Sequence, residues 1–204
     1  RRGLGSIRQD LNVSIACGDR VEIKGCQDLD WIPQIISLEM GRQLHMYRLA
    51  NELRSEANLP PLPPNRDDDN IPVENRVSVA ATSRLSLDIQ DLSGCFAVCE
   101  SEMVRTSLSE GSRVQGVALS GFAGKIGSKR LDNDGAQLPR LGRELASAAR
   151  LAGVAGIFHS DELPAYGISE TEVAEVRQAL SLEEPDAFVL CVAPAWQSEL
   201  ALEA

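Results

Sequence analysis

A proline- and aspartate-rich stretch, residues 59–70, divides the chain into two parts of different character. Four prolines in five positions favour extended polyproline backbone, and the three successive aspartates that follow repel one another and stay solvated. Such a stretch is typical of a stiff linker. An aspartate triplet can also bind a cation, but this one does not follow the glycine-containing pattern of an EF-hand loop. We therefore expect separate folding of residues 1–58 and 76–204, with residues 59–75 between them.

In the first part, residues 6–15 and 20–24 alternate polar with apolar side chains, as half-buried β-strands do. If the two segments pair as a hairpin, their polar side chains form one face, which we call the polar plate. On such a plate, carboxylates could ligate a metal ion and cations could neutralise a phosphate. A solvent-facing hairpin with salt bridges would show the same alternation. The plate residues are Arg8, Asp10 and Asn12 from the first segment and Glu22 and Lys24 from the second.

Apolar residues recur at helical spacing after the hairpin, from Ile32 to about Asn58. Asp30 is the expected cap of this helix, and Pro33 is tolerated in its first turn. The sequence therefore predicts a long helix that supports the hairpin.

The second part alternates element types. Strands are predicted at 113–119 and, as a continuous apolar run, at 186–192, with helices at 96–108 and 141–152. Ser169 and Glu172 form a capping box that opens another helix. The predicted fold class is α+β: the hairpin and long helix, then a compact α/β-layer domain with a mainly antiparallel or mixed sheet. The residues expected to face inward from helix 141–152 are Leu141, Leu145, Ala148 and Leu151.

The charge is distributed unevenly along the chain. The net charge is −10, but residues 1–58 carry 8 basic and 8 acidic side chains, so the excess lies in the second part. Any contact with nucleic acid is therefore expected from the first part or from one local basic run. Because Asp132 and Asp134 interrupt that run, a solvated loop explains it equally well. The candidate nucleic-acid contacts in the run are Lys125, Lys129, Arg130 and Arg143.

Two short motifs contain residue types that occur in catalytic sites, but they lack the spacing that such sites require. Residues 121–127 are glycine-rich but lack the Walker spacing of a phosphate-binding loop. His159, Ser160 and Asp161 are the residue types of a hydrolase triad, but adjacent residues do not converge as a triad requires. We expect both motifs to be structural.

The five cysteines lack zinc-site spacing. The chain has no membrane-length apolar run and no signal-peptide pattern at its start. A cytoplasmic protein with reduced thiols is therefore expected.

Two motifs resemble a known family. Residues 3–15 with 20–25 resemble the B/E family of tRNA-dependent amidotransferase subunits, and the closer resemblance is to the E-type subunits of archaeal glutamyl-tRNA(Gln) amidotransferases. Residues 152–168 resemble the insert domain that these E-type subunits share with bacterial aspartyl-tRNA synthetases. The resemblance implies a fragment of a longer protein: the end of a catalytic cradle domain (1–58), a linker (59–75) and most of the insert domain (76–204).

The resemblance also implies a chemistry. E-type subunits take part in the ATP- and Mg²⁺-dependent conversion of Glu-tRNA(Gln) to Gln-tRNA(Gln), and ammonia comes from an asparaginase-like D-type subunit that is the heterodimer partner. On this basis Asp10 and Glu22 would face the metal, Arg8 and Lys24 the phosphates, and Asn12 would position the reactants. The other metal ligands would lie upstream, so the fragment alone should be inactive. Two alternatives stay open: a non-catalytic tRNA-binding or docking module, and a free-standing acidic ligand-binding domain.

Overall fold

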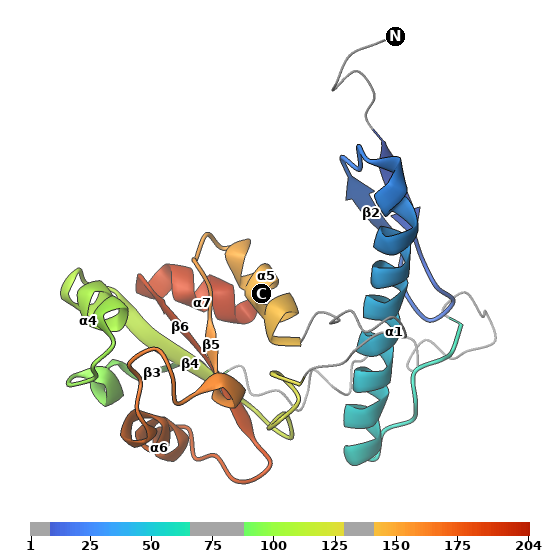
Figure 1. Ribbon diagram of the computed structural model, residues 1–204. Helices are drawn as coiled ribbons and strands as arrows, with labels where there is room; N and C mark the ends of the chain where they lie inside the picture. The colour runs from blue at the N-terminus through green and yellow to red at the C-terminus, as the bar shows by residue number, and fades with distance from the viewer. Residues whose placement is uncertain (1–8, 66–87, 129–140) are drawn as a thin grey trace. The chain divides into compact units, whose positions relative to one another are not determined.

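The computed structural model describes residues 9–65, 88–128 and 141–204, and these fall into two compact units (Figure 1). The first unit contains residues 9–65, and the second contains residues 88–128 and 141–204. Helices and antiparallel sheets occur together, so the predicted α+β class is confirmed. None of the helices within these ranges is both long and apolar enough to cross a membrane.

The first unit begins with the predicted hairpin. Strand β1 (Asp10–Val13) pairs antiparallel with β2 (Val21–Lys24). Side chains alternate between exposed and partly or fully buried along both strands, with Val13 only 5% exposed. The alternation that predicted the hairpin therefore reflects one solvent-facing and one packed surface.

The long helix of the first unit follows a short 3₁₀ turn, η1 (Leu29–Trp31), and runs as α1 (Ile32–Glu56). Asp28, and not the predicted Asp30, caps this start: its side chain accepts a hydrogen bond from the Asp30 backbone N–H at 3.0 Å. Pro33 lies in the first turn, where its missing N–H costs no helical hydrogen bond. The helix ends two residues before Asn58, whose φ of 54° is left-handed.

The chain then turns back along α1. Arg54 Nε donates to the Pro60 carbonyl at 2.6 Å, and Asn51 Oδ1 accepts from the Leu62 N–H at 2.7 Å. Tyr47 Oη, about two helical turns before Arg54, donates to the Leu62 carbonyl at 3.0 Å. The first part of the predicted linker is thus hydrogen-bonded to the helix before it, and residues 66–75 lie outside the described residues.

A four-stranded sheet in the order β3-β4-β6-β5 is the centre of the second unit. Every neighbouring pair in it is antiparallel. The longest pairing joins β4 and β6 from Arg113 opposite Ala193 to Leu119 opposite Ala187. The apolar run that predicted a central strand is β6. The strands are β3 (Gln90–Asp91), β4 (Arg113–Leu119), β5 (Phe158–His159) and β6 (Ala187–Ala193).

Helices cover both faces of this sheet. On one face, residues from α4 (Glu102–Ser109) and α6 (Glu170–Ala179) pack with Phe188 and Leu190. On the other, residues from α5 (Leu141–Arg150) and α7 (Ala195–Glu203) pack with Val189 and Cys191. The result is the predicted layered domain, with an antiparallel sheet between two helical layers.

The structure confirms one local prediction for the second unit and corrects two others. The capping box is confirmed, because Ser169 and Glu172 each hydrogen-bond the other's backbone at the start of α6. The helix predicted at 96–108 is wrong in its first half: Phe96 ends a 3₁₀ turn, η2 (Ser93–Phe96), and residues 97–101 form a loop before Glu102. Leu151 is 88% exposed, because α5 ends at Arg150 and Leu151 no longer shares its inward face.

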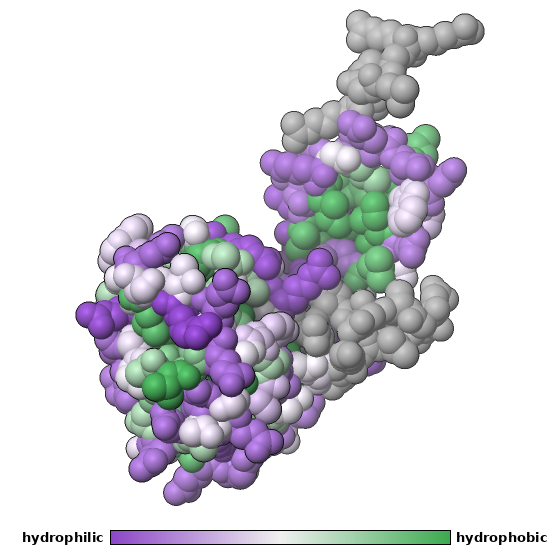
Figure 2. Space-filling model, turned by 60° about the vertical axis from the view of Figure 1, so that its left-hand side comes forward, coloured by the Kyte–Doolittle hydropathy of each residue, from purple (hydrophilic) through white to green (hydrophobic). Residues whose placement is uncertain are grey.

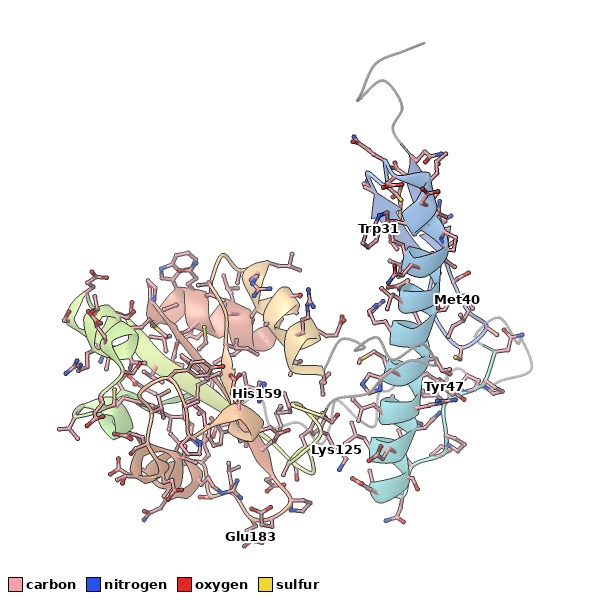
Figure 3. The ribbon with its side chains drawn as sticks, viewed as in Figure 1. Trp31, Met40, Tyr47, Lys125, His159 and Glu183 are labelled. Atoms are coloured by element: carbon pink, nitrogen blue, oxygen red, sulfur yellow. The ribbon has the colours of Figure 1, made fainter. Side chains whose placement is uncertain are left out.

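The first unit keeps apolar side chains at its surface. Figure 2 shows hydrophobic side chains gathered on the visible face of this unit, with hydrophilic ones around them. Leu29, Trp31 and Met40 are 61%, 57% and 44% exposed, and Figure 3 shows Trp31 and Met40 extending from the upper part of the helix.

Candidate active site

The polar plate lies on the exposed face of the hairpin. The strand register places Asp10 opposite Lys24 and Asn12 opposite Glu22, and all four side chains are exposed. Asp10 and Glu22 are diagonal neighbours, whose Cα atoms in such a ladder lie about 7–8 Å apart. Four of the five predicted plate residues are thus on one surface, and Arg8 lies outside the described residues.

The charged groups of the plate are held only weakly. Lys24 Nζ lies 3.5 Å from a Glu22 carboxylate oxygen, with side chains 62% and 48% exposed. An ion pair this exposed contributes little to stability and can exchange its partner for a ligand. Asp10 Oδ1 accepts a hydrogen bond from the Gly25 N–H at 3.2 Å, which orients that carboxylate at the start of β1.

A β-bulge ends the plate beyond Lys24. The N–H groups of both Gly25 and Cys26 donate to the Gln9 carbonyl, at 3.1 and 3.0 Å, so two residues face one. Gly25 has a φ of +77°, which glycine adopts without strain, as in a G1 bulge. The bulge ends the regular ladder after the pair of Asp10 and Lys24, and so helps to hold the register of the plate.

Behind the plate, buried polar residues of α1 hold the end of β1. Gln43 hydrogen-bonds the backbone of Val13 and of Ile15, and Glu39 accepts from Gln43 and, through two bonds, from Arg42. Burial alone would raise the pKa of Glu39, but the hydrogen bonds from Arg42 and Gln43 and the charge of Arg42 outweigh it and lower that pKa. Glu39 is therefore a carboxylate at neutral pH.

The donor set of the plate fits a magnesium ion in part. Mg²⁺ prefers oxygen ligands, keeps several waters and is commonly bound by one or two carboxylates together with substrate phosphates. Asp10 and Glu22 supply two carboxylates on one accessible surface, and Asn12 supplies an amide oxygen beside them. Within the residues that the structure describes, no group of three or more His, Cys, Asp or Glu could hold a metal ion by itself. The plate therefore offers two carboxylates and needs further ligands.

The predicted basic run in the second unit is described only at its two ends. Ile126, next to Lys125, accepts a backbone hydrogen bond from Gly142, next to Arg143, at 2.9 Å, so the structure brings these two cations into one region. Lys125 Nζ donates to the Gly121 carbonyl at 3.1 Å, while Arg143 is exposed in the first turn of α5. Lys129 and Arg130 lie outside the described residues.

The glycine-rich segment 121–127 is occupied by an internal carboxylate. Asp161 accepts hydrogen bonds from the Gly124 N–H at 2.9 Å and from the Gly127 N–H at 2.8 Å, one to each oxygen. The amides that could cradle a phosphate already bind an anion of the same chain. The neighbours of Asp161 are structural too: Ser160 Oγ accepts from the Phe188 N–H at 3.3 Å, and His159 is only 7% exposed. Figure 3 shows His159 within the unit, near the labelled Lys125.

Sequence reasoning missed the roles of Glu39, Gln43 and Asp161. A signal for the first two was present: Ile32, Ile36, Glu39 and Gln43 follow the spacing of one helix face, so the two polar residues interrupt an apolar stripe. Polar residues at such positions indicate buried hydrogen bonds. For Asp161 no signal was available, because its partners lie 34 and 37 residues away.

Comparison with known proteins finds two family models that match overlapping parts of the chain. Residues 2–141 match the GatB/GatE catalytic domain, well over half of the chain. The chain belongs to the GatB/GatE family. Residues 104–202 also match the GAD domain. Together with the relatives that follow, these matches confirm the predicted resemblance to E-type subunits.

Curated archaeal relatives match along the whole chain. The E-type subunits of glutamyl-tRNA(Gln) amidotransferase from Methanopyrus kandleri, Pyrococcus furiosus and Haloarcula marismortui are 38%, 40% and 37% identical to it, each over 204 residues and 100% of this chain. The chain spans 28% of the length of each of these relatives. This GatB/GatE family member thus corresponds to a segment of the E-type subunit that contains the polar plate and the layered second unit.

Proposed function

We propose that the chain supplies part of the active site of a tRNA-dependent amidotransferase that converts Glu-tRNA(Gln) to Gln-tRNA(Gln). In this reaction the γ-phosphoryl group of ATP is transferred to the side-chain carboxylate of the glutamyl residue, which releases ADP. Ammonia then attacks the activated carbonyl carbon, phosphate leaves, and the amide remains. The observation that carries the proposal is the polar plate, which joins two carboxylates, an amide and a cation on the accessible face of a hairpin within the catalytic-domain match.

Each plate residue has a role in this proposal that its chemistry suits. Asp10 and Glu22 would hold Mg²⁺, which when bound neutralises phosphate charge during phosphoryl transfer. Lys24 would bind a phosphate oxygen, and its ion pair with Glu22 is weak enough to be given up for that contact. Asn12, which lies opposite Glu22 on β1, would donate a hydrogen bond that orients the substrate. Arg8, in the same motif, would add a second phosphate contact.

The ammonia and the further metal ligands that the reaction needs would come from outside this chain. Ammonia would come from an asparaginase-like D-type amidotransferase subunit, which forms a heterodimer with the E-type one, and further metal ligands would come from protein beyond this chain. The chain alone should therefore not form Gln-tRNA(Gln). The reaction would take place in the cytoplasm, where its tRNA substrate is charged.

The decisive test changes the plate carboxylates in the full-length protein assembled with its partner. We expect Asp10→Asn and Glu22→Gln each to reduce amidation at least about 100-fold, because each removes a charge that the metal site needs while keeping side-chain size. Affinity for tRNA should stay nearly unchanged. Asp19→Asn, in the turn of the same hairpin, is the matched control and should retain activity.

Two results would count against the proposal. If both plate variants amidate at the rate of the Asp19→Asn control, the plate is not catalytic. If amidation and tRNA affinity fall together by the same factor, the plate binds tRNA and the chemistry lies elsewhere, as in a docking module.

A further inference from the structure

The side chain of Gln43 binds the backbone of β1 where the strand ends. Its Nε2 donates to the Val13 carbonyl at 3.3 Å, and its Oε1 accepts from the Ile15 N–H at 3.3 Å. The residue is only 6% exposed. One amide thus satisfies a backbone acceptor and a backbone donor two residues apart, as a neighbouring strand would. Helix α1 in this way provides an additional partner for β1 beyond its last pairing with β2.

The orientation of this amide is set by Glu39. Gln43 Nε2 also donates to Glu39 Oε1 at 2.9 Å, and Arg42 fixes the same carboxylate through Nε at 2.7 Å and Nη2 at 2.8 Å. Were the amide turned over, its oxygen would face both the Val13 carbonyl and the Glu39 carboxylate, which are also acceptors. A buried repulsion of that kind is unfavourable. Only the orientation that matches β1 is therefore compatible with an ionised Glu39.

Gly18 provides the space that Gln43 needs. A Cβ atom at this position would lie 2.0 Å from Gln43 Oε1 and 2.9 Å from its Cδ. The N–H of Gly18 donates to the Ile15 carbonyl at 2.9 Å, which closes the turn over the amide. Any larger residue at position 18 would push the amide away from β1. The hairpin turn and the helix are thus fitted to each other at this point.

We propose that Gln43 is a positioning residue for the amidation reaction: by fixing the end of β1 on α1, it sets where Asp10 and Asn12 stand relative to Glu22 and Lys24. The inference rests on the proposed function of the plate. Val13, which Gln43 binds, is three residues from Asp10 on a strand of four, so a shift of the strand end moves the plate with it. A displacement of about 1 Å at a reacting group can lower a rate about 100-fold.

The first test replaces Gln43 by Met in the full-length protein assembled with its partner. Met keeps the length of the side chain and removes both backbone contacts. We expect kcat to fall about 10- to 100-fold, the KM for Glu-tRNA(Gln) to stay within about twofold, and the Mg²⁺ concentration for half-maximal rate to rise. Gln34→Met, at an exposed position of the same helix, is the control and should behave as the unchanged protein.

The second test uses Gly18→Ala, which acts on the same amide from the opposite side. It should reproduce the lower kcat and the higher Mg²⁺ requirement. Gln43→Ala removes the atoms that lie within 3.0 Å of the new methyl group and leaves only Ile15 Cγ1, at 3.1 Å, close to it. Gly18→Ala added to Gln43→Ala should therefore lower kcat much less than Gly18→Ala alone does. Hydrogen exchange gives a readout without catalysis: the Ile15 amide should exchange faster in Gln43→Met, while the amides in the middle of α1 remain protected.

The outcomes separate this inference from the function on which it rests. Gln43→Met with the kcat and Mg²⁺ dependence of Gln34→Met would overturn the positioning role, and so would full additivity of Gly18→Ala with Gln43→Ala. If Asp10→Asn is inactive in the same preparation, the proposed function stands even then. If Asp10→Asn and Glu22→Gln are both fully active, the proposed function fails, whatever Gln43 does.

Discussion

Single residues of this chain matter most where they bring two backbone segments together. Gly116 is an example in the second unit, since a Cβ there would lie 2.7 Å from the side chains of both Leu190 and Leu92 and 3.1 Å from the Val189 carbonyl. The two leucines are 0% and 3% exposed and cannot move into solvent. The close packing of β4 on β6 therefore requires glycine at this position.

We expect Gly116→Ala to lower the free energy of unfolding by about 1–3 kcal/mol, as overpacking a core does. Urea unfolding followed by circular dichroism measures the change. Gly94→Ala is the matched control, because a Cβ there meets nothing within 4 Å and the residue is exposed. Equal midpoints for the two variants would show that β4 and β6 can separate to accept a methyl group.

Burial also decides the chemistry of single cysteines. Cys191 in β6 is 0% exposed, and desolvation raises its pKa to about 11. We expect this thiol to resist alkylation by iodoacetamide at pH 8 in the folded chain and to react fully in denaturant, as peptide mass spectrometry would show. Rapid labelling of Cys191 without denaturant would mean that the central strand opens.

At the scale of elements, the start of α6 depends on a reciprocal pair. The Thr171 N–H donates to Ser169 Oγ at 3.2 Å, the Ser169 N–H donates to Glu172 Oε2 at 2.8 Å, and the two side chains hydrogen-bond each other. The hydrogen bond from the Ser169 side chain is the main cause of a lowered pKa of Glu172. The ionised form of Glu172 is therefore the one that stabilises the fold.

We expect Ser169→Ala to lower the free energy of unfolding by about 1 kcal/mol at pH 7.

Because the folded pKa of Glu172 is below its usual value of 4.5, the contribution of Glu172 to stability is present above that pH and is lost as the pH falls through the folded pKa. The difference between the unchanged protein and Glu172→Gln should therefore shrink below pH 4.5. Denaturant melts at pH 7 and pH 3 measure this, and a difference that stays constant would contradict it.

Elements with a local signal could be predicted from the sequence, and those without one could not. Alternation over residues 10–24 gave the hairpin and the sharing of one face by Asp10, Asn12, Glu22 and Lys24, because strand geometry dictates which side chains lie together. The capping box gave the start of α6 for the same local reason. In contrast, the Asp161 contacts and the bonds of Gln43 to Val13 and Ile15 join distant segments, and nothing in either local pattern specifies such a contact. The start of α7 at Ala195 was also missed, since Pro194 alone separates it from a long apolar strand.

At the scale of the molecule, the hydrophobic core clusters found among the described residues lie in the second unit. We expect Leu190→Ala, which empties space in the core of the second unit, to destabilise that unit by about 2–5 kcal/mol. Hydrogen exchange should speed up in β4 and β6 and stay unchanged in the middle of α1. Faster exchange in α1 as well would show that the two units unfold together.

Charge at this scale bears on the proposed contact with tRNA. Lys125 and Arg143 are the described members of the basic run, in an otherwise acidic half of the chain. If they contact tRNA phosphates, the double variant Lys125→Ala with Arg143→Ala should weaken tRNA binding by the full-length protein and reduce the slope of log K against log salt by up to about 2. Arg105→Ala, a variant of an exposed arginine on α4, is the control. An unchanged slope would exclude this region as a phosphate contact.

The return of the chain along α1 after Asn58 has a mechanical consequence. The Leu62 carbonyl is hydrogen-bonded to Tyr47 Oη, and Glu56 lies nine residues beyond Tyr47, or about 13 Å of helix rise, so the described residues after Asn58 run back along the side of α1. Fraying of the last helical turn should be resisted by this returning segment, because Arg54 in that turn is hydrogen-bonded to the Pro60 carbonyl.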